Sequence, residues 1–387
     1  MPASYQGYSN TDFARSMSTT LAKHRVDLES EVLRNFQLGA LLEANGRVSY
    51  NHSGRGFDWP VQYRLHTAEG NTGETPRNFT RTNLWKTAEL GYRGYQVTDA
   101  IYMKEVKENS GPEGIVKVFN NLTSRLSTSL KQHFGTQYYI DGNATGNENC
   151  WHGFESMMGR NTTNDTIAID GTGARAANQA DIVVNPSDTY AGLSTVLGNY
   201  GGEQESSVPW PHGVASLEYD FWSPLQVVFD STAFGGTDDT FDKGHEAIRY
   251  GLIHAQRNAS GASGQVTQVM LDRELFRELK KSQAAKEEII IDNASQGSLR
   301  SLGFKNNMIF DGVEVTFENG VPNRVGYGFN INGMELVSMT DSLLMTEGPE
   351  YDIASQSYRA VVSTLSNLVF HTPRNTFKLL EYDTVAA

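Results

Sequence analysis

The six residues at positions 171–176, Gly-Thr-Gly-Ala-Arg-Ala, are the nearest approach to a cofactor-binding motif in the sequence. Their spacing superficially matches the glycine turn that holds the pyrophosphate of a dinucleotide. That turn must open a helix whose N-terminus faces the phosphates. The next strand-like segment begins only a few residues later, at Ile182. The sequence therefore favours a glycine turn in a loop over a cofactor site.

The histidines and the single cysteine give no pattern of metal ligands. No two of the nine histidines have the i, i+4 spacing of a helical zinc site, and His245 and His254 fall on different faces of one predicted helix. Cys150 follows no nearby basic residue that would activate a thiolate. We expect it to be a buried thiol that packs as a small hydrophobic residue.

Signals for nucleophilic or phosphate chemistry are also weak. No glycine-rich loop ends in Lys-Ser or Lys-Thr, and Gly261-Ala262-Ser263-Gly264 lacks the spacing of a nucleophile elbow. A hydrolytic triad is recognised by geometry, so an α/β enzyme with an unrecognised active site stays an open alternative. We predict no catalytic residue, no cofactor and no metal.

Composition narrows the class of protein. A chain of 387 residues suggests two or three domains of ~150 residues each. The apolar share of 38% becomes about 43% when the 17 tyrosines are left out and the 37 glycines are counted. This is slightly below the usual ~45–50% and indicates a lean core. A net charge of −13 without a basic block argues against sequence-specific nucleic-acid binding. No segment approaches the ~18 apolar residues of a membrane span or the pattern of a signal peptide, so we expect a soluble protein made in a cytosol.

One cysteine permits no internal disulfide, so stability must come from packing or from association with other chains. The predicted N-terminal elements indicate that association with other chains contributes to stability. Residues 11–43 have helical spacing that ends at Asn45-Gly46. Residues 57–65 and 88–103 alternate as strands around a polar stretch at 66–83. An isolated hairpin is marginally stable in water, so this one needs another surface.

A long amphipathic helix is the strongest helical signal. Pro112 and Glu113 fit its first turn. A helix over 112–134 would be ~35 Å long. Its single apolar stripe consists of Ile115, Phe119, Leu122, Leu126, Leu130 and Phe134.

The second half of the chain predicts an α/β module followed by a small antiparallel sheet. The module alternates helices at 239–257 and 272–285 with strands at 266–271 and 288–291. Two tight hairpins follow, turning at Asp311-Gly312 and at Asn332-Gly333. Residues 141–224 are rich in Gly, Asn, Thr and Ser and show few elements.

This series of elements resembles the major capsid proteins of tailed bacteriophages, which have the Hong Kong 97-type fold. The resemblance is most specific from Trp85 to Gly153 and covers most of the chain. The motifs that carry it include Leu84-Trp85-Lys86-Thr87-Ala88, Asn109-Ser110-Gly111, Tyr138-Tyr139-Ile140-Asp141-Gly142, Trp151-His152-Gly153-Phe154, Leu302-Gly303-Phe304, Phe310-Asp311-Gly312-Val313-Glu314-Val315 and Thr372-Pro373-Arg374.

The resemblance implies an α+β architecture with an axial α/β domain. It divides the chain into an N-terminal arm at 1–44, an extended hairpin loop at 45–100, a peripheral domain at 101–142 and 306–356, and an axial domain at 143–305 and 357–387. The peripheral domain would contain the long spine helix and the small antiparallel sheet. The hairpin would gain its stability by lying on the spine helix of a neighbouring subunit.

The implied function is that of a shell protein without catalysis. It would self-assemble into pentamers and hexamers and form the icosahedral head around double-stranded DNA, passing through a procapsid that matures. Its partners would be further copies, a separate scaffolding protein, a portal and, optionally, a decoration protein, with no membrane. The protein would be located in the virion after assembly in the host cytoplasm. An encapsulin-like nanocompartment shell is the alternative within the same fold.

The same resemblance implies which residues take part in assembly. Packing of the spine helix would use Ile115, Phe119, Leu122 and Leu126. Trp59 and Trp85 are expected to pack at the base of the hairpin. No lysine occurs between Lys23 and Lys86, so the loop has no donor for lysine–asparagine bonds and we expect a non-covalent shell. Contacts between subunits would come from loop residues Trp59, Glu69, Glu74, Arg77 and Arg81, although a charged loop tip can also be merely solvated.

Overall fold

The computed structural model describes a little under three-fifths of the sequence. In that part of the chain, no helix is long and apolar enough to cross a membrane. The described residues are mainly 36–62, 83–108, 132–158, 189–195, 222–231, 241–256, 264–284 and 307–381, with single residues and short pieces between them.

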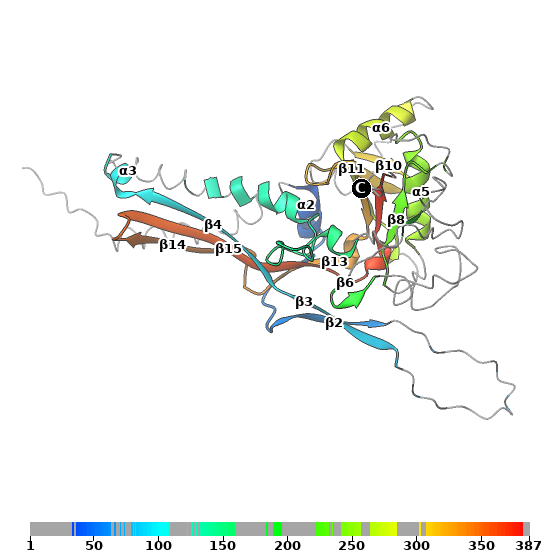
Figure 1. Cartoon of the computed structure of the whole chain (residues 1–387), viewed down its shortest axis with the longest axis horizontal. Helices are drawn as coiled ribbons and strands as arrows, with labels where there is room; N and C mark the ends of the chain where they lie inside the picture. The colour runs from blue at the N-terminus through cyan, green and yellow to red at the C-terminus, as the bar shows by residue number, and fades with distance from the viewer. Residues whose placement is uncertain are drawn as a thin grey trace, which may run out of the picture.

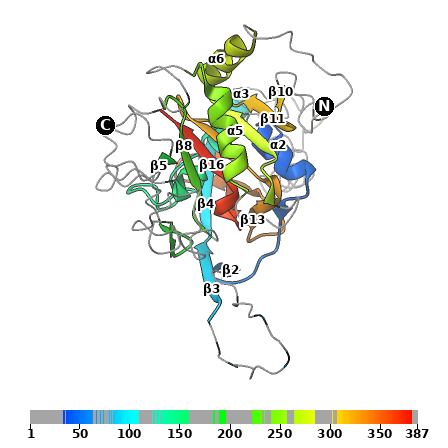
Figure 2. The same cartoon turned by 90° about the vertical axis from the view of Figure 1, so that its right-hand side faces the viewer.

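A seven-stranded sheet forms the lobe that carries helices α5 (Gly244–His254) and α6 (Arg273–Ala284). Helix α5 packs against β8 and β16 (Figure 2). All residues of β8, β9, β12 and β16 are buried, as expected for strands covered on both faces. In spatial order the strands are β10 (Asn307–Phe310), β11 (Val313–Phe317), β9 (Gln268–Leu271), β12 (Gly326–Phe329), β16 (Phe377–Leu380), β8 (Leu225–Val228) and β5 (Val183–Val184).

This lobe confirms the predicted α/β module, with a helix, a strand and a helix at the expected positions. The apolar stripe of α6 is buried through Leu275, Phe276 and Leu279. The strand expected at 288–291 and the glycine turn at 171–176 lie outside the described residues.

A five-stranded sheet forms a long, narrow wing beside the lobe (Figure 1). Its central strand β15 (Ser357–Phe370) pairs along one edge with β4 (Arg93–Tyr102), from Ser357↔Tyr102 to Ser366↔Arg93. Its other edge pairs first with β14 (Met345–Asp352) and then with β13 (Met334–Ser338). Strand β1 (Val48–Ser49) adds to β13, and the short helix α3 (Met103–Glu108) follows β4 at the far end of the wing.

The first predicted tight hairpin is confirmed. β10 and β11 pair from Asn307↔Thr316 to Phe310↔Val313. The turn residues Asp311 and Gly312 have φ values of 48° and 81°, which match a two-residue turn with both central residues in the left-handed region.

The second predicted hairpin, around Asn332-Gly333, is wrong. Strands β12 and β13 belong to different sheets and are joined by a 3-10 turn, Ile331–Gly333. Both edges of β12 are already paired, with β9 and with β16, so β13 has no free edge of β12 to join. The chain instead crosses from the lobe to the wing at this point.

The small antiparallel sheet expected in the peripheral domain is therefore not a separate sheet. β10, β11 and β12 extend the seven-stranded sheet, whereas β13 joins the wing. The range 306–356, expected to lie in one domain, thus contributes strands to both sheets. The boundaries of the four domains themselves stay a prediction.

Strands β2 (Gly56–Gln62) and β3 (Trp85–Gly91) form the predicted hairpin, in register from Gly56↔Gly91 to Gln62↔Trp85. It is shorter than expected. The strand predicted at 88–103 is divided at Tyr92, and its second half is β4 of the wing. The hairpin extends away from the junction of lobe and wing (Figure 1).

The spine helix keeps its apolar stripe where the structure describes it. Leu122, Leu126, Leu130 and Phe134 are all buried, so this part of the prediction is confirmed. Ile115 and Phe119, and the predicted start at Pro112, lie outside the described residues. The arm helix α2 (Gln37–Ala44) ends at the predicted Asn45-Gly46 pair.

Candidate assembly surfaces and the joints that position them

One face of the β2–β3 hairpin packs against the rest of the described structure and anchors the base of the hairpin. Trp59, Val61, Ala88 and Leu90 are buried on that face. The Trp59 ring lies 5.5 Å from the ring of His371, which follows β15, in an edge-to-face arrangement. It also lies 6.5 Å from the ring of Trp222. These contacts seat the first residues of the hairpin on the junction between lobe and wing.

The opposite face of the hairpin is exposed. Trp85 is 53% exposed there, and Thr87 and Glu89 on the same face are exposed as well. Packing at the hairpin base is therefore confirmed for Trp59 and wrong for Trp85. Tryptophan is enriched at protein interfaces, where its large ring supplies contact area.

Of the other predicted assembly residues, the structure describes Arg81. Arg81 and Phe79 are exposed, Phe79 at 90%. Glu69, Glu74 and Arg77 lie outside the described residues. The roles of Trp59, Arg81 and these three residues in contacts between subunits stay a prediction.

A buried carboxyl group seats the arm helix, and sequence reasoning missed it. Glu318, just after β11, accepts hydrogen bonds from the backbone N–H of Leu38 at 3.4 Å and from the hydroxyl of Tyr139. Gln37 adds bonds to the same strand, donating to the carbonyl of Phe317 at 2.9 Å. Burial raises the pKa of Glu318 to about 7, against the opposing effect of these donors. The arm helix α2, the end of the spine helix and the lobe are therefore all in contact with the Glu318 carboxyl group.

A second joint ties the hairpin to the wing. The Oδ1 atom of Asn367 accepts the backbone N–H groups of His152 at 2.9 Å and Leu368 at 2.9 Å. Its Nδ2 atom therefore faces as a donor towards the carbonyl of Gly91 at 2.7 Å and the ring Nδ1 of His152 at 2.8 Å. Burial, with the nearby charge of Arg93, lowers the pKa of His152 to about 4, so the ring is neutral.

A third joint lies between the 154–157 turn and the lobe. Lys378 on β16 and Glu155 form an ion pair of 2.7 Å, and the Lys378 side chain is only 8% exposed. The hydroxyl of Tyr327 on β12 donates to the same carboxylate. Burial and the Glu155 charge raise the pKa of Tyr327 well above its ordinary range, so the tyrosine stays protonated and donates. No local pattern in the sequence marks this pair.

The sequence predicts no metal and no cofactor in the described part of the chain, and the residues that bear on this are few. No group of three or more His, Cys, Asp or Glu residues is arranged there to hold a metal ion. Cys150 is partly buried and packs against the core of the wing and spine, short of the full burial expected. The motif at 171–176 lies outside the described residues.

The chain is similar to solved capsid structures. The chain superposes on the capsid asymmetric unit of cyanophage A-1(L) with a TM-score of 0.54 and 11% identity, covering 88% of this chain and 92% of that chain. The capsid of the native GTA particle matches at 0.49 and 10% identity, over 88% and 90%. The capsid of cyanophage P-SCSP1u matches at 0.45 and 13% identity, over 86% and 85%. No family model and no curated protein matches the sequence.

The similarity to the cyanophage A-1(L) subunit shows the fold. It extends over nearly the whole of both chains. The chain has the α+β, Hong Kong 97-type capsid fold that its series of elements predicts.

Proposed function

We propose that this chain is the shell-forming subunit, the major capsid protein, of a tailed bacteriophage. The observation that carries the proposal is the capsid fold over 88% of the chain. The exposed face of the hairpin supports it, because Trp85 lies half in solvent on a two-stranded ribbon, a structure that is marginally stable without another surface to pack on. A neighbouring copy would cover this face and complete the packing.

Self-assembly into pentamers and hexamers follows from contacts of this kind. A head-to-tail contact between identical copies forms a ring when its rotation closes, and two ring sizes permit a curved shell. Each subunit then makes many weak contacts, which multivalency combines into a stable particle. Such a subunit needs no catalytic residue.

The charge of the subunit fits an enclosure for double-stranded DNA. A shell built from subunits with a net charge of −13 does not bind the negatively charged phosphates of DNA strongly. The enclosed DNA therefore stays free to leave the shell. A separate scaffolding protein, a portal and, optionally, a decoration protein are the further partners in this proposal. Its place is the virion, reached after assembly in the host cytoplasm.

Size-exclusion chromatography and negative-stain microscopy of the purified chain test the function. Particles tens of nanometres across are expected, and a clean monomer or dimer would contradict the proposal. A variant lacking residues 66–80 is the matched sample, because it removes the hairpin tip and leaves β2 and β3 in place. It should fold, as judged by circular dichroism, and form no shells. Shells of normal yield from this variant would show that the loop does not bridge subunits.

A further inference from the structure

The turn at the far end of the wing has a fixed structure. Residues 353–356 join β14 to β15 at the end opposite the α5 and α6 lobe (Figure 1). The Asp352 carboxylate accepts the backbone N–H of Ala354 at 3.0 Å and the hydroxyl of Ser355 at 2.8 Å. It also forms a 2.6 Å ion pair with Arg359. The turn is therefore shaped by its own side chains before it meets any partner.

This turn presents an isoleucine to solvent. Ile353 is 81% exposed, more than any other large aliphatic side chain in the described part of the chain. Turns ordinarily carry polar residues or glycine, whose side chains or flexibility fit the bend. An exposed isoleucine on a preorganised turn loses little conformational entropy when a partner covers it.

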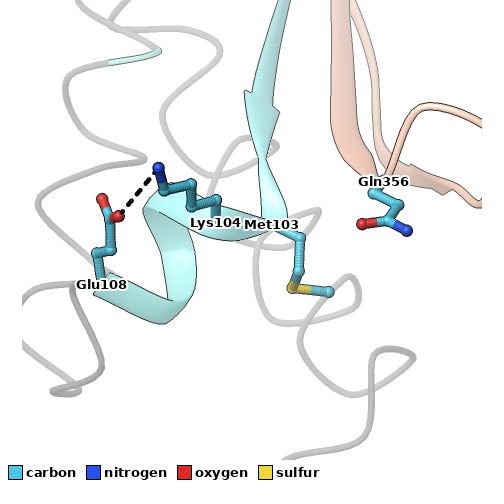
Figure 3. Close-up of a pocket in the computed structure, with 4 residues that line it drawn as sticks. All are labelled: Met103, Lys104, Glu108 and Gln356. Carbon is cyan, nitrogen blue, oxygen red and sulfur yellow. Dashed lines mark ion pairs between the residues drawn. The ribbon is translucent and has the colours of Figure 1, made fainter.

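A hollow of about 350 Å³ lies directly beside the turn. Its lining includes Met103, Lys104 and Glu108 from α3 and Gln356 from the turn (Figure 3). The backbone N–H of Met103 donates to the carbonyl of Gln356 at 2.8 Å, so α3 and the turn are held together. The Met103 thioether supplies an apolar surface, and Lys104 and Glu108 form an ion pair of 3.7 Å at the rim.

We propose that Ile353 of one copy inserts into this hollow on a second copy of the chain. This inference rests on the proposed function, since it names one contact by which the subunits assemble. Ile353 does not fill the hollow of its own chain, because it remains 81% exposed. Every copy therefore presents one protruding side chain and one receiving hollow at the same end.

Charge complementarity favours a second copy as the occupant. Asp352 and Arg359 flank the isoleucine, and Lys104 and Glu108 flank the hollow. When two copies meet, Arg359 can face Glu108 and Asp352 can face Lys104, so each negative group meets a positive one. The contact joins two different patches, so it either forms in both directions between two copies or continues around a ring.

Engineered cysteines test the contact in assembled particles of the full chain. The double variant Ile353→Cys with Met103→Cys should form disulfides between copies under mild oxidation, visible as a covalent ladder on a non-reducing gel. Each single variant should run as one chain. The highest rung of the ladder gives the number of copies in the closed contact. A double variant that stays as single chains, or an Ile353→Cys variant that cross-links equally well alone, would overturn the proposal.

A charge substitution gives an independent readout. Ile353→Asp should fold with the unfolding temperature of the wild-type chain, because the side chain is exposed, and should lower the yield of particles roughly tenfold or more. Ile353→Leu, the matched control, should assemble normally. Equal yields for the Asp and Leu variants would contradict the inference while leaving the shell function intact. A wild-type chain that forms no particles would contradict the shell function, and the inference would fall with it.

Discussion

The side-chain amide of Asn367 holds His152 at two atoms, accepting its backbone N–H at 2.9 Å and donating to its ring Nδ1 at 2.8 Å. The same amide donates to the carbonyl of Gly91 at the end of the hairpin. One side chain of the central wing strand thus fixes both the hairpin and the segment that follows the spine. This joint works only while the imidazole is neutral, because a protonated Nδ1 would place two donors against each other.

The neutral imidazole should make stability depend on pH. Burial lowers the pKa of His152 from 6.5 to about 4, so the unfolded chain binds more protons between these values. The stability contributed by His152 is complete above pH 6.5 and is lost as pH falls towards 4, by roughly 2–3 kcal/mol. Unfolding temperatures of the free subunit, compared between the wild-type chain and His152→Gln, check this. Parallel curves from pH 7 to 4 would contradict it.

Glu318 should have the opposite dependence on pH. Burial raises its pKa from 4.5 to about 7, so the folded chain binds more protons in this window. Its contribution is greatest below pH 4.5 and is lost as pH rises through 7. Leu38 and Tyr139 donate to different oxygens of the Glu318 carboxyl group, so Glu318→Gln loses one acceptor but also removes the buried charge. The variant should be more stable than the wild-type chain at pH 8 by about 2 kcal/mol. Glu43→Gln, on the same arm helix but away from this joint, serves as the control and should change little.

Removing only one partner of the buried ion pair between Lys378 and Glu155 should lower the free energy of unfolding. Lys378→Met leaves the Glu155 carboxylate without its cation, which should reduce the free energy of unfolding by about 3 kcal/mol. The double variant with Glu155→Gln should recover part of this loss, because Tyr327 can still donate to the amide oxygen. Denaturant unfolding of the two single variants and the double variant measures the coupling. Additive losses would show that the two groups act independently.

Substitutions at the two tryptophans of the hairpin should affect different properties: stability at Trp59 and assembly at Trp85. Trp59→Ala removes a buried ring and should cost about 3 kcal/mol or more of stability. Trp85→Ala removes a half-exposed ring and should change stability by less than about 0.5 kcal/mol, yet lower the yield of particles. Unfolding temperature and particle yield, measured on the same samples, give the comparison. Normal particles from Trp85→Ala would remove this side chain from the proposed contact.

The shell is expected to be non-covalent, since no lysine lies between Lys23 and Lys86. Particles denatured by heat should therefore give one band at the mass of a single chain on a reducing gel. A ladder under these conditions would show bonds other than disulfides between subunits.

Short-range patterns explain most of what was predictable. The stripe through Leu126, Leu130 and Phe134 follows from helical spacing, and the Asp311-Gly312 turn follows from the demand for positive φ at two successive residues. Both depend only on nearby residues, so the sequence shows them directly.

The predictions that were wrong concern strands whose pairing is decided by other strands distant in the sequence. Asn332-Gly333 has the same turn chemistry as Asp311-Gly312, but both edges of β12 are occupied by strands that are distant in sequence. The division at Tyr92 has the same origin, because β4 gains ten paired positions on β15 by leaving the hairpin. Glu318 and His152 resemble any other Glu or His in the sequence, and their shifted pKa values come from burial by remote segments.

Two crossings between the sheets lie side by side. Residues 330–333 carry the chain from β12 to β13, and residues 371–376 carry it from β15 to β16. The backbone N–H of His371 donates to the carbonyl of Gly333 at 2.9 Å, so the two crossings are fastened together. The two sheets also share one packed core at this point, because Phe329 of β12 and Phe370 of β15 both pack on the ring of Phe154. The wing and the lobe are therefore joined by side-chain packing across the junction as well as by the chain that crosses it.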